Sequence, residues 1–212
     1  MKRNIKNLMK KKIVIIGAGG HARSCIDVIE NTNSNFKILG LVEKKNFIKK
    51  TFPKYKVICL EKDLNKLAKK NIYAMVGFGG IKNLKKRSII FNKLIGLKFK
   101  IPIIKSRNAY ISSNSQIGSG TIVMHGSVVN FGVKIGKNCI INSNCTIEHD
   151  VVIGNHCHIA PGAIINGGVK ISDYTFVGSG AVIKENIKIS TNCIVGANSF
   201  LKKNLSKNKA YK

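Results

Sequence analysis

The sequence lacks the features that mark membrane-spanning, secreted and disulfide-rich proteins. No apolar run approaches the roughly 20 residues needed to span a bilayer. The basic N-terminus contains only the short apolar run 13–16, whereas the core of a secretory signal has about 7–15 apolar residues. The six cysteines include no C-x-x-C pair, so their spacing indicates neither a disulfide framework nor a zinc ribbon. We therefore expect a cytoplasmic protein without a membrane span.

Acidic residues and arginine are also scarce. The chain has 9 Asp and Glu against 37 Lys and Arg, and only four of those basic residues are arginine: Arg3, Arg23, Arg87 and Arg107. Sites that read bases or grip phosphates favour arginine, and the lysines here are scattered, so we do not expect nucleic-acid binding despite a net charge of +28. The positive field instead attracts polyanionic small molecules, such as nucleotide sugars or coenzyme A.

A period of six residues runs through the second half of the chain. From Ile111 to Ser206 the sequence divides into sixteen consecutive hexads. The first position is Ile, Val or Leu in all of them, the fourth is Gly, Asn or Asp in fourteen, and the fifth is mostly small. Hexapeptide repeats of this kind are the sequence signature of a parallel β-helix.

Each position of the hexad has a physical reason. An aliphatic residue at every sixth position forms an inward-pointing stack, and Gly, Asn and Asp adopt the left-handed backbone at little cost, so each hexad holds a strand and a turn. Three hexads then make one triangular coil of 18 residues, and sixteen hexads stack into a little over five coils. An α-helix needs a period of 3.6, and an antiparallel sandwich shows turns every 8–12 residues, so neither fits.

The same period gives four of the six cysteines a plain role. Cys139, Cys145, Cys157 and Cys193 all occupy the fifth, small-residue position. We expect them to be interior packing residues rather than metal ligands or redox groups.

The part of the chain before the hexads follows a different pattern. Residues 12–43 read as strand, glycine-rich turn, helix and strand, and the helix has apolar residues at helical spacing: Ala22, Cys25, Ile26 and Ile29. Another strand and glycine turn follow in 71–80, and residues 81–96 predict an amphipathic helix. The 212 residues are enough for two small domains. We predict a Rossmann-like α/β domain over residues 1–105 and a parallel β-helix over residues 106–212.

The first strand runs into the motif G-x-G-x-x-A, formed by Gly17, Gly19 and Ala22, and Glu43 ends the second strand. This is formally the dinucleotide-binding fingerprint, in which backbone N–H groups at a helix N-terminus hold a phosphate. Because the domain is too short for two mononucleotide halves, we expect some nucleotide ligand rather than NAD. A tight strand-to-helix turn without a ligand is the alternative.

One histidine of the hexad region, His149, stands out by its position. Gly167 lies eighteen residues later and therefore one coil above it, followed by Gly168. We expect their bare backbone beside the imidazole, where an N–H group can receive a developing oxyanion. A histidine paired with a carboxylate is a competent general base near neutral pH, and either Glu148 or Asp150 can supply that carboxylate. Asp150 also fits a plain role as a turn residue.

The other histidines do not converge on His149. His156 occupies the turn position and is expected to face outward, whereas His158 lies half a coil from His149 and suits a site wall or a coenzyme contact. His125 is one coil and one face away, so it can meet His149 only across a subunit boundary. Because zinc needs three or four convergent ligands, we expect no metal site.

The motifs together resemble the PglD/NeuD family of bacterial sugar acetyltransferases. The resemblance rests on "GAGGHAR" after the first strand and on "IEHDVVIGNHCHIAPGA" within the hexads, and it covers the chain from about Lys12 to about residue 205. It implies a left-handed β-helix, homotrimers with their β-helices side by side, and acetyl-CoA in the groove between neighbouring subunits.

The resemblance also implies roles for individual residues. His149 is expected to be the general base, Asp150 to orient it, and the Gly167 amide to contact the thioester carbonyl. His158 and Gly168 are expected, with Gly167, at the coenzyme site. The expected nucleotide-sugar site consists of Gly17, Gly19, Gly20, His21 and Glu43.

The function expected from these features is direct transfer of acetyl from acetyl-CoA to the amine of a UDP- or GDP-linked amino sugar, in the synthesis of a bacterial surface glycan or glycoprotein. Cys145 and Cys157 lie inside the expected coil, so we expect no acyl-enzyme. Phe78 stands where many family members carry an asparagine. O-acetylation of a sialic-acid-type sugar is an alternative with the same base chemistry, and a non-catalytic nucleotide-sugar-binding protein is a more distant one.

Overall fold

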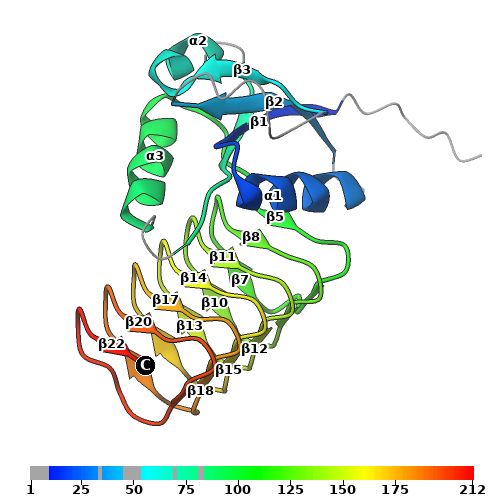
Figure 1. The fold of residues 1–212 in the computed structure, drawn as a ribbon. Helices are drawn as coiled ribbons and strands as arrows, with labels where there is room; N and C mark the ends of the chain where they lie inside the picture. The colour runs from blue at the N-terminus through cyan, green and yellow to red at the C-terminus, as the bar shows by residue number, and fades with distance from the viewer. Residues whose placement is uncertain (1–9, 33–34, 45–53, 69–70, 81–83) are drawn as a thin grey trace, which may run out of the picture.

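The computed structural model describes residues 10–32, 35–44, 54–68, 71–80 and 84–212. The chain forms an α/β domain that packs on one side of a left-handed parallel β-helix, so the predicted fold class is confirmed (Figure 1). Within the described ranges, none of the helices combines the length and the apolar character that crossing a membrane requires.

The α/β domain has one four-stranded parallel sheet in the order β3-β2-β1-β4, with helices on both faces. Its elements are β1 (Lys11–Ile16), α1 (Gly20–Asn31), β2 (Phe36–Glu43), β3 (Val57–Leu60), the 3-10 helix η1 (Glu61–Asp63), α2 (Leu64–Ala68), β4 (Tyr73–Val76) and α3 (Leu84–Gly96). Strand β1 is apolar on both sides because Ile13 and Ile15 pack against α1, whereas Val14 and Ile16 pack in the cluster that includes α2 and α3.

Sequence patterns located most of these elements but gave no structure for residues 57–68. Strand β3 and helix α2 are four and five residues long, so neither fills the window in which a hydrophobic period is recognised. The helix predicted over 81–96 is confirmed from Leu84 onward, and residues 81–83 lie outside the described ranges.

The β-helix consists of two-residue strands in three parallel sheets, one for each side of the triangular coil. The sheet named face B contains β5 (Ile104–Lys105), β8 (Ile122–Val123), β11 (Ile140–Ile141), β14 (His158–Ile159), β17 (Phe176–Val177), β20 (Ile194–Val195) and β22 (Ala210–Tyr211). Face C contains β6 (Tyr110–Ile111), β9 (Val128–Val129), β12 (Thr146–Ile147), β15 (Ile164–Ile165), β18 (Val182–Ile183) and β21 (Phe200–Leu201). Face D contains β7 (Gln116–Ile117), β10 (Lys134–Ile135), β13 (Val152–Ile153), β16 (Lys170–Ile171) and β19 (Lys188–Ile189).

Neighbouring strands of each face pair eighteen residues apart, as Lys134 does with Val152, so the predicted coil length is confirmed. A left-handed residue lies in the turn between successive strands, because φ is positive at every sixth position from Gly120 to Asn198. Glycine and asparagine fill most of these positions, but His156 and Tyr174 adopt φ of 59° and 58°. A β-carbon in this conformation costs roughly 1–2 kcal/mol, so contacts at these two turns must offset the strain.

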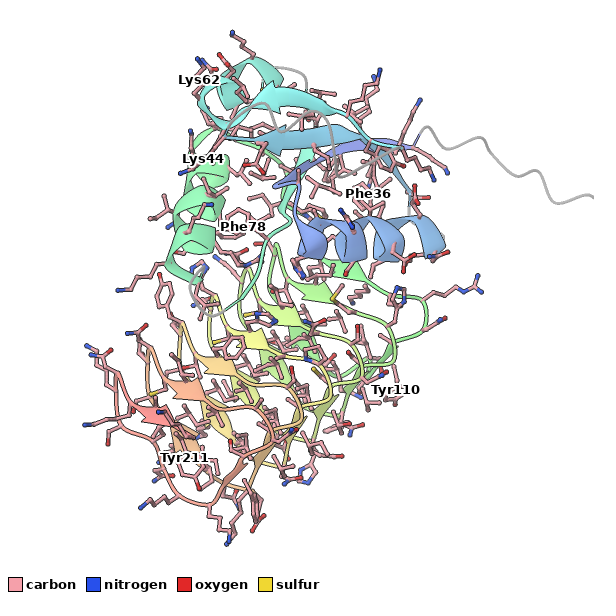
Figure 2. The ribbon with its side chains drawn as sticks, in the orientation of Figure 1. Phe36, Lys44, Lys62, Phe78, Tyr110 and Tyr211 are labelled. Atoms are coloured by element: carbon pink, nitrogen blue, oxygen red, sulfur yellow. The ribbon has the colours of Figure 1, made fainter. Side chains whose placement is uncertain are left out.

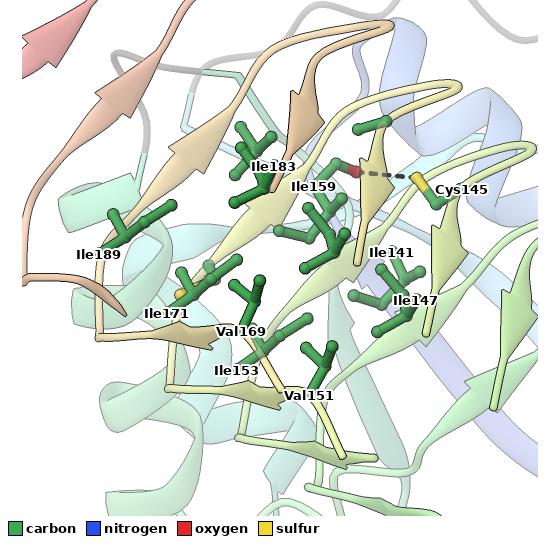
Figure 3. Packing of buried hydrophobic residues seen from close by; sticks show 14 of the residues in the cluster. Ile141, Cys145, Ile147, Val151, Ile153, Ile159, Val169, Ile171, Ile183 and Ile189 are labelled. Carbon is green, nitrogen blue, oxygen red and sulfur yellow. Dashed lines mark hydrogen bonds between the residues drawn. The ribbon is translucent and has the colours of Figure 1, made fainter. Parts of the chain in front are cut away.

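The first and fifth hexad positions point into the coil and form a continuous aliphatic core. Figure 3 shows the rows that contain Ile141, Ile147, Ile153 and Ile159, all of which are buried. Full burial of one such side chain contributes about 1.5–3 kcal/mol, and the contribution repeats at every coil.

Hydroxyl and thiol groups line the core along the edge between faces D and B. The column consists of Thr121, Cys139, Cys157, Thr175 and Cys193, which are fully buried. Each side chain donates to a backbone carbonyl on the next coil, as Cys157 Sγ does to the Ser172 oxygen at 3.2 Å and Thr175 Oγ1 to the Ser190 oxygen at 3.2 Å. The cysteines are free, and their predicted interior position is confirmed.

The last coil is two residues shorter than the others. Ile189 forms a bridge with Leu205 and Ile194 pairs with Ala210, so both partners lie sixteen residues apart. An unbroken period would instead place Lys207 opposite Ile189, beside the core. The predicted register is therefore wrong for the last hexad, because burying a lysine ammonium costs more than shortening one turn.

The three outer faces of the β-helix expose different side chains. Face B is covered by the α/β domain, where Ile122 and Ile140 join the cluster that includes α1. Face C leaves apolar side chains exposed, namely Tyr110 (61%), Ile164 (37%) and Phe200 (46%), and Tyr110 is labelled on the outside of the coil in Figure 2. Face D carries lysines such as Lys170 and Lys188.

A polar network joins α1 to the first coils. His125 Nε2 lies 2.9 Å from Asp27 Oδ2, and His125 Nδ1 lies 2.7 Å from Ser106 Oγ. These residue types also form hydrolase triads, but Ser106 is only 4% exposed and its Oγ accepts the Asn108 N–H. The network is therefore a structural tie between the domains, and it accounts for His125 without a role beside His149.

A second junction lies between α3 and the β-helix. His156 stacks on Tyr174 with ring centroids 5.0 Å apart and contacts Phe91 of α3 edge-on at 5.7 Å, and Asn138 Nδ2 lies 3.0 Å from His156 Nδ1. His156 has the predicted turn conformation and points out of the coil toward α3, but it is only 9% exposed. Helix α3 covers this turn, and the ring contacts offset the backbone strain.

We expect Cys157→Thr to leave the free energy of unfolding nearly unchanged, because Thr121 and Thr175 already make the same kind of hydrogen bond in this column. Cys157→Ala removes the donor to the Ser172 carbonyl and should lower the free energy of unfolding by about 1–3 kcal/mol. Urea unfolding followed by circular dichroism measures both variants. Equal destabilisation by threonine and alanine would contradict this account of the column.

Candidate functional site

The edge between faces C and D carries the predicted base. His149 lies in the turn between β12 and β13, and its side chain is 65% exposed. Its Nδ1 lies 3.0 Å from Asp150 Oδ2, so the carboxylate binds one ring nitrogen and leaves Nε2 facing away. An imidazole held in this way carries its proton on Nδ1, and Nε2 is then free to accept another.

Asp150 fills both of the roles that the sequence left open. Its φ of 59° is the left-handed turn conformation, and its N–H donates to the Phe131 oxygen at 3.0 Å. Glu148 is turned to the other side, where its Oε2 accepts from Asn130 Nδ2 at 2.9 Å. Of the two flanking carboxylates, Asp150 is therefore the one that contacts His149.

Gly167 lies directly beside the imidazole, on the next coil. A β-carbon at Gly167 would lie 2.7 Å from both Nε2 and Cε1 of His149, so only glycine leaves room for this contact. Gly168 has φ of 70° and donates its N–H to the His149 oxygen at 3.0 Å. The Gly167 N–H donates no hydrogen bond within the described part of the chain, so it is available to an oxygen bound next to the base.

The glycine loop of the α/β domain lies at the C-terminal ends of β1 and β4, where the strand order changes direction. Gly17 has φ of 109°, and a β-carbon there would lie 3.1 Å from the Phe78 ring. Helix α1 begins at Gly20, and neither an acidic first-turn residue nor a side-chain cap occupies its start among the described residues. Its first N–H groups are therefore free to bind an anion such as a phosphate.

The remaining motif residues support this loop. Glu43 accepts the Ala18 N–H at 3.2 Å and the Lys44 N–H at 2.8 Å, so the end of β2 is tied to the turn after β1. A β-carbon at Gly77 would lie 3.3 Å from Ala22 Cβ, which shows how closely α1 approaches the end of β4. The small third position of the motif therefore serves close helix–sheet packing.

His21 and His158 meet below the glycine loop, with ring centroids 6.4 Å apart. Burial, together with the positive charge of Arg87, lowers the pKa of His158 to about 4. Burial, Arg87 and His158 lower the pKa of His21 to about 3, and His21 Nε2 has no partner in the described structure. Both imidazoles are thus neutral near pH 7 and present uncharged ring nitrogens to a ligand.

The predicted residues therefore form two clusters rather than one. The first, the base cluster, consists of His149, Asp150, Gly167 and Gly168 at the C/D edge. The second, the loop cluster, consists of Gly17, Gly19, Gly20, His21, Glu43 and His158. His158 belongs to β14 on face B, across the coil from the C/D edge, so one chain does not bring the clusters together.

Three further residues lie beside the loop cluster, and no sequence motif predicts them. Gly80 donates its N–H to His158 Nδ1 at 3.3 Å, and Asn142 Nδ2 lies 3.3 Å from His158 Nε2. Arg87 lies behind both histidines and is 1% exposed. Its only sequence signal is rarity, since it is one of four arginines among 37 basic residues. Among the described residues, no group of three or more His, Cys, Asp or Glu is placed to hold a metal ion.

Comparison with known families matches both halves of the chain. Residues 12–94 match the PglD N-terminal domain, and residues 132–167 match the bacterial transferase hexapeptide repeat. No curated protein matches the chain in sequence.

Several solved structures resemble the whole chain. The acetyltransferase domain of PglB from Neisseria gonorrhoeae FA1090 is 24% identical, with a TM-score of 0.86 over 94% of this chain and 95% of that one. PerB from Caulobacter crescentus, solved with CoA and GDP-perosamine, is 25% identical, with a TM-score of 0.83 over 95% and 91%. WeeI from Acinetobacter baumannii AYE is 24% identical, with a TM-score of 0.80 over 94% of each chain.

The domain order, the glycine loop and the hexapeptide coil with its histidine edge thus agree with both family matches. The chain therefore combines a PglD N-terminal domain with a bacterial transferase hexapeptide repeat, and it is an acetyltransferase of the hexapeptide-repeat class.

Proposed function

We propose that this protein transfers the acetyl group of acetyl-CoA to the amine of a nucleotide-linked amino sugar, in the synthesis of a bacterial surface glycan or glycoprotein. The observation that carries the proposal is the base cluster, in which His149 is paired with Asp150 and lies against the free Gly167 amide. The binding of CoA and GDP-perosamine by PerB supports the same substrate class here.

The proposed chemistry uses two nitrogen atoms, Nε2 of His149 and the backbone N of Gly167, on either side of the reacting carbonyl. The acceptor amine forms a bond to the thioester carbon while His149 Nε2 takes its proton, and Asp150 stabilises the imidazolium that results. The carbonyl oxygen gains negative charge and accepts the Gly167 N–H. The C–S bond then breaks, and the His149 imidazolium gives its proton to the departing sulfur, which releases CoA as the thiol. One oxyanion donor is worth about 10²–10³ in rate, and a positioned base about 10²–10⁴.

The acceptor is bound by its nucleotide at the loop cluster. The free N–H groups at the start of α1 suit the diphosphate, and the net charge of +28 attracts both anionic substrates. The neutral imidazoles of His21 and His158 lie in the same cluster.

A complete site requires a second copy of the chain, because the two clusters lie on opposite sides of the coil. We propose a homotrimer with active sites between subunits. Face C suits the contact: its exposed outward side chains are apolar, including Ile164 and Phe200, whereas face D carries Lys170 and Lys188. A chain of this charge associates best through a surface with few lysines, and on face C Lys202 lies over the Phe200 ring.

His149→Ala is expected to lower kcat by about 10²–10⁴, because it removes the base. The measurement is thiol release from acetyl-CoA with UDP- and GDP-linked amino sugars and with sialic-type hydroxyl acceptors. Release with hydroxyl acceptors alone would replace the proposed reaction by O-acetylation.

A matched pair of controls tests the carboxylate. Asp150→Asn should lower kcat by about tenfold or more, whereas Glu148→Gln should have little effect, because Glu148 bonds to Asn130. Full turnover by His149→Ala would reject the base assignment.

Gly167→Ala is expected to lower kcat by about 10²-fold without unfolding the protein, because its β-carbon occupies the space of the His149 ring. Gly162→Asn is the control, since φ there is 69° and nothing lies closer than 3.9 Å to the added β-carbon. Steady-state kinetics and a thermal melt are measured for both variants. Normal kcat in Gly167→Ala would show that the close approach of Gly167 to the His149 ring is not needed for catalysis.

Mixing two inactive variants tests the shared site. Gly20→Glu places a carboxylate at the start of α1 and should block the phosphate, whereas His149→Ala removes the base. If sites form between subunits, refolding the two together should restore about a quarter of the sites, since each site takes one cluster from each neighbour. Activity that stays at the level of the separate variants would place both clusters' function within one chain.

A further inference from the structure

The buried arginine at the junction of the two domains contacts groups on three elements. Arg87 of α3 donates from Nη1 to the carbonyls of Val76 and Phe78, at the end of β4, and from Nη2 to Asn138 Oδ1 at 2.9 Å in the β-helix. Figure 2 shows Phe78 between α3 and α1, above the coil. One guanidinium thus ties the turn after β4 to the β-helix.

This cation is held without a counter-charge. No carboxylate contacts Arg87 within the described part of the chain, and its Nε has no partner there. Burial lowers the pKa of Arg87 to about 10. Burying an unpaired cation is costly, and a neutral side chain would fill the same space at less cost, so the guanidinium serves a purpose other than stability.

The turn that Arg87 holds is pressed against His158. Gly80, two residues after Phe78, donates its N–H to His158 Nδ1 at 3.3 Å. A β-carbon at Gly79 would lie 2.9 Å from Ile140 Cδ1 and 3.5 Å from His158 Cε1, so the turn lies in contact with face B. The position of the Phe78 carbonyl therefore sets the position of the Gly80 N–H.

The other side of His158 also faces a donor. Asn142 Oδ1 accepts the Ser143 N–H, which turns Asn142 Nδ2 toward His158 Nε2. Since a neutral imidazole has one N–H, the Gly80 bond places that proton on Nε2. Asn142 Nδ2 and His158 Nε2 are then both donors, so the Gly80 bond forms in place of the Asn142 bond.

We propose that Arg87 is a positioning residue of the nucleotide-sugar site: it holds the turn from Phe78 to Gly80 so that Gly80 fixes His158 in the tautomer with its proton on Nε2. The inference rests on the proposed function, since it names how the acceptor is oriented.

The charges around the histidine favour the same tautomer. Only His21 of α1 and Arg87 of α3 place a titratable or charged side chain beside His158 among the described residues, and both histidines are neutral near pH 7. Protonation of His158 would put an N–H on Nδ1, against the Gly80 N–H. The positive charge of Arg87 opposes that protonation. Arg87 therefore supports the contact between Gly80 and His158 both through its hydrogen bonds to the turn and through its charge.

Three variants separate positioning from stability. Arg87→Lys keeps the charge but not the planar set of donors, and Arg87→Gln removes both. Asn138→Gly removes the side chain that contacts Arg87 and His156, at a position whose φ of 54° suits glycine. The measurements are thermal melts, KM for the nucleotide sugar and for acetyl-CoA between about pH 5 and 7.5, and binding of UDP and GDP by calorimetry.

We expect both Arg87 variants to raise KM for the nucleotide sugar about tenfold, with KM for acetyl-CoA unchanged, because one charge-assisted hydrogen bond is lost. In Arg87→Gln the rise should grow as the pH falls toward 5, since the pKa of His158 increases without the nearby cation, and in Arg87→Lys it should not. Asn138→Gly should lower the melting temperature with KM unchanged.

Lower melting temperatures in the Arg87 variants with unchanged KM and unchanged pH dependence would overturn the inference. Arg87 would then only stabilise the junction between the domains. That outcome does not touch the proposed reaction, which is tested separately by the turnover of His149→Ala and by the panel of amine and hydroxyl acceptors. An equal rise of both KM values in all three variants would also overturn it, because the effect would then come from the domain junction as a whole.

Discussion

The eighteen-residue register of the coil determines where every functional group of the β-helix lies. Strands of two residues cannot slip without turning their one inward side chain outward, so the aliphatic stack fixes the register at each coil. That register brings the Gly167 backbone against the His149 ring and aligns the thiols and hydroxyls of the Cys157 column. The geometry of the base cluster is thus a by-product of core packing, and it holds only while the stack is in register.

Features that repeat locally could be predicted from the sequence. Each hexad contains its own core residue and its own turn, so the coil, the buried cysteines and the pairing of His149 with Gly167 follow from counting along the chain. The same reasoning failed at the last hexad, where Leu205 takes the place that the period gives to Lys207. There the chemistry of one side chain outweighed the repeat.

Features that depend on contact between the domains could not be predicted. Nothing in the hexad of His156 shows that α3 covers this residue. Gly80, a partner of His158, comes from a turn nearly eighty residues earlier. Arg87 carries no motif, and its partners are backbone carbonyls, which have no sequence signal. Sequence reasoning therefore could not show that the fold brings His158 beside His21 of the glycine loop.

The turn position suggests how such a coil acquires new neighbours. A left-handed residue contributes nothing to the core, so its side chain is free to change while the stack stays intact. On two successive coils the residue at the turn position is aromatic, namely His156 and Tyr174, and these rings form a packing surface for α3. Another domain can therefore pack on such a β-helix after substitutions at the turn positions alone, while the core residues stay unchanged.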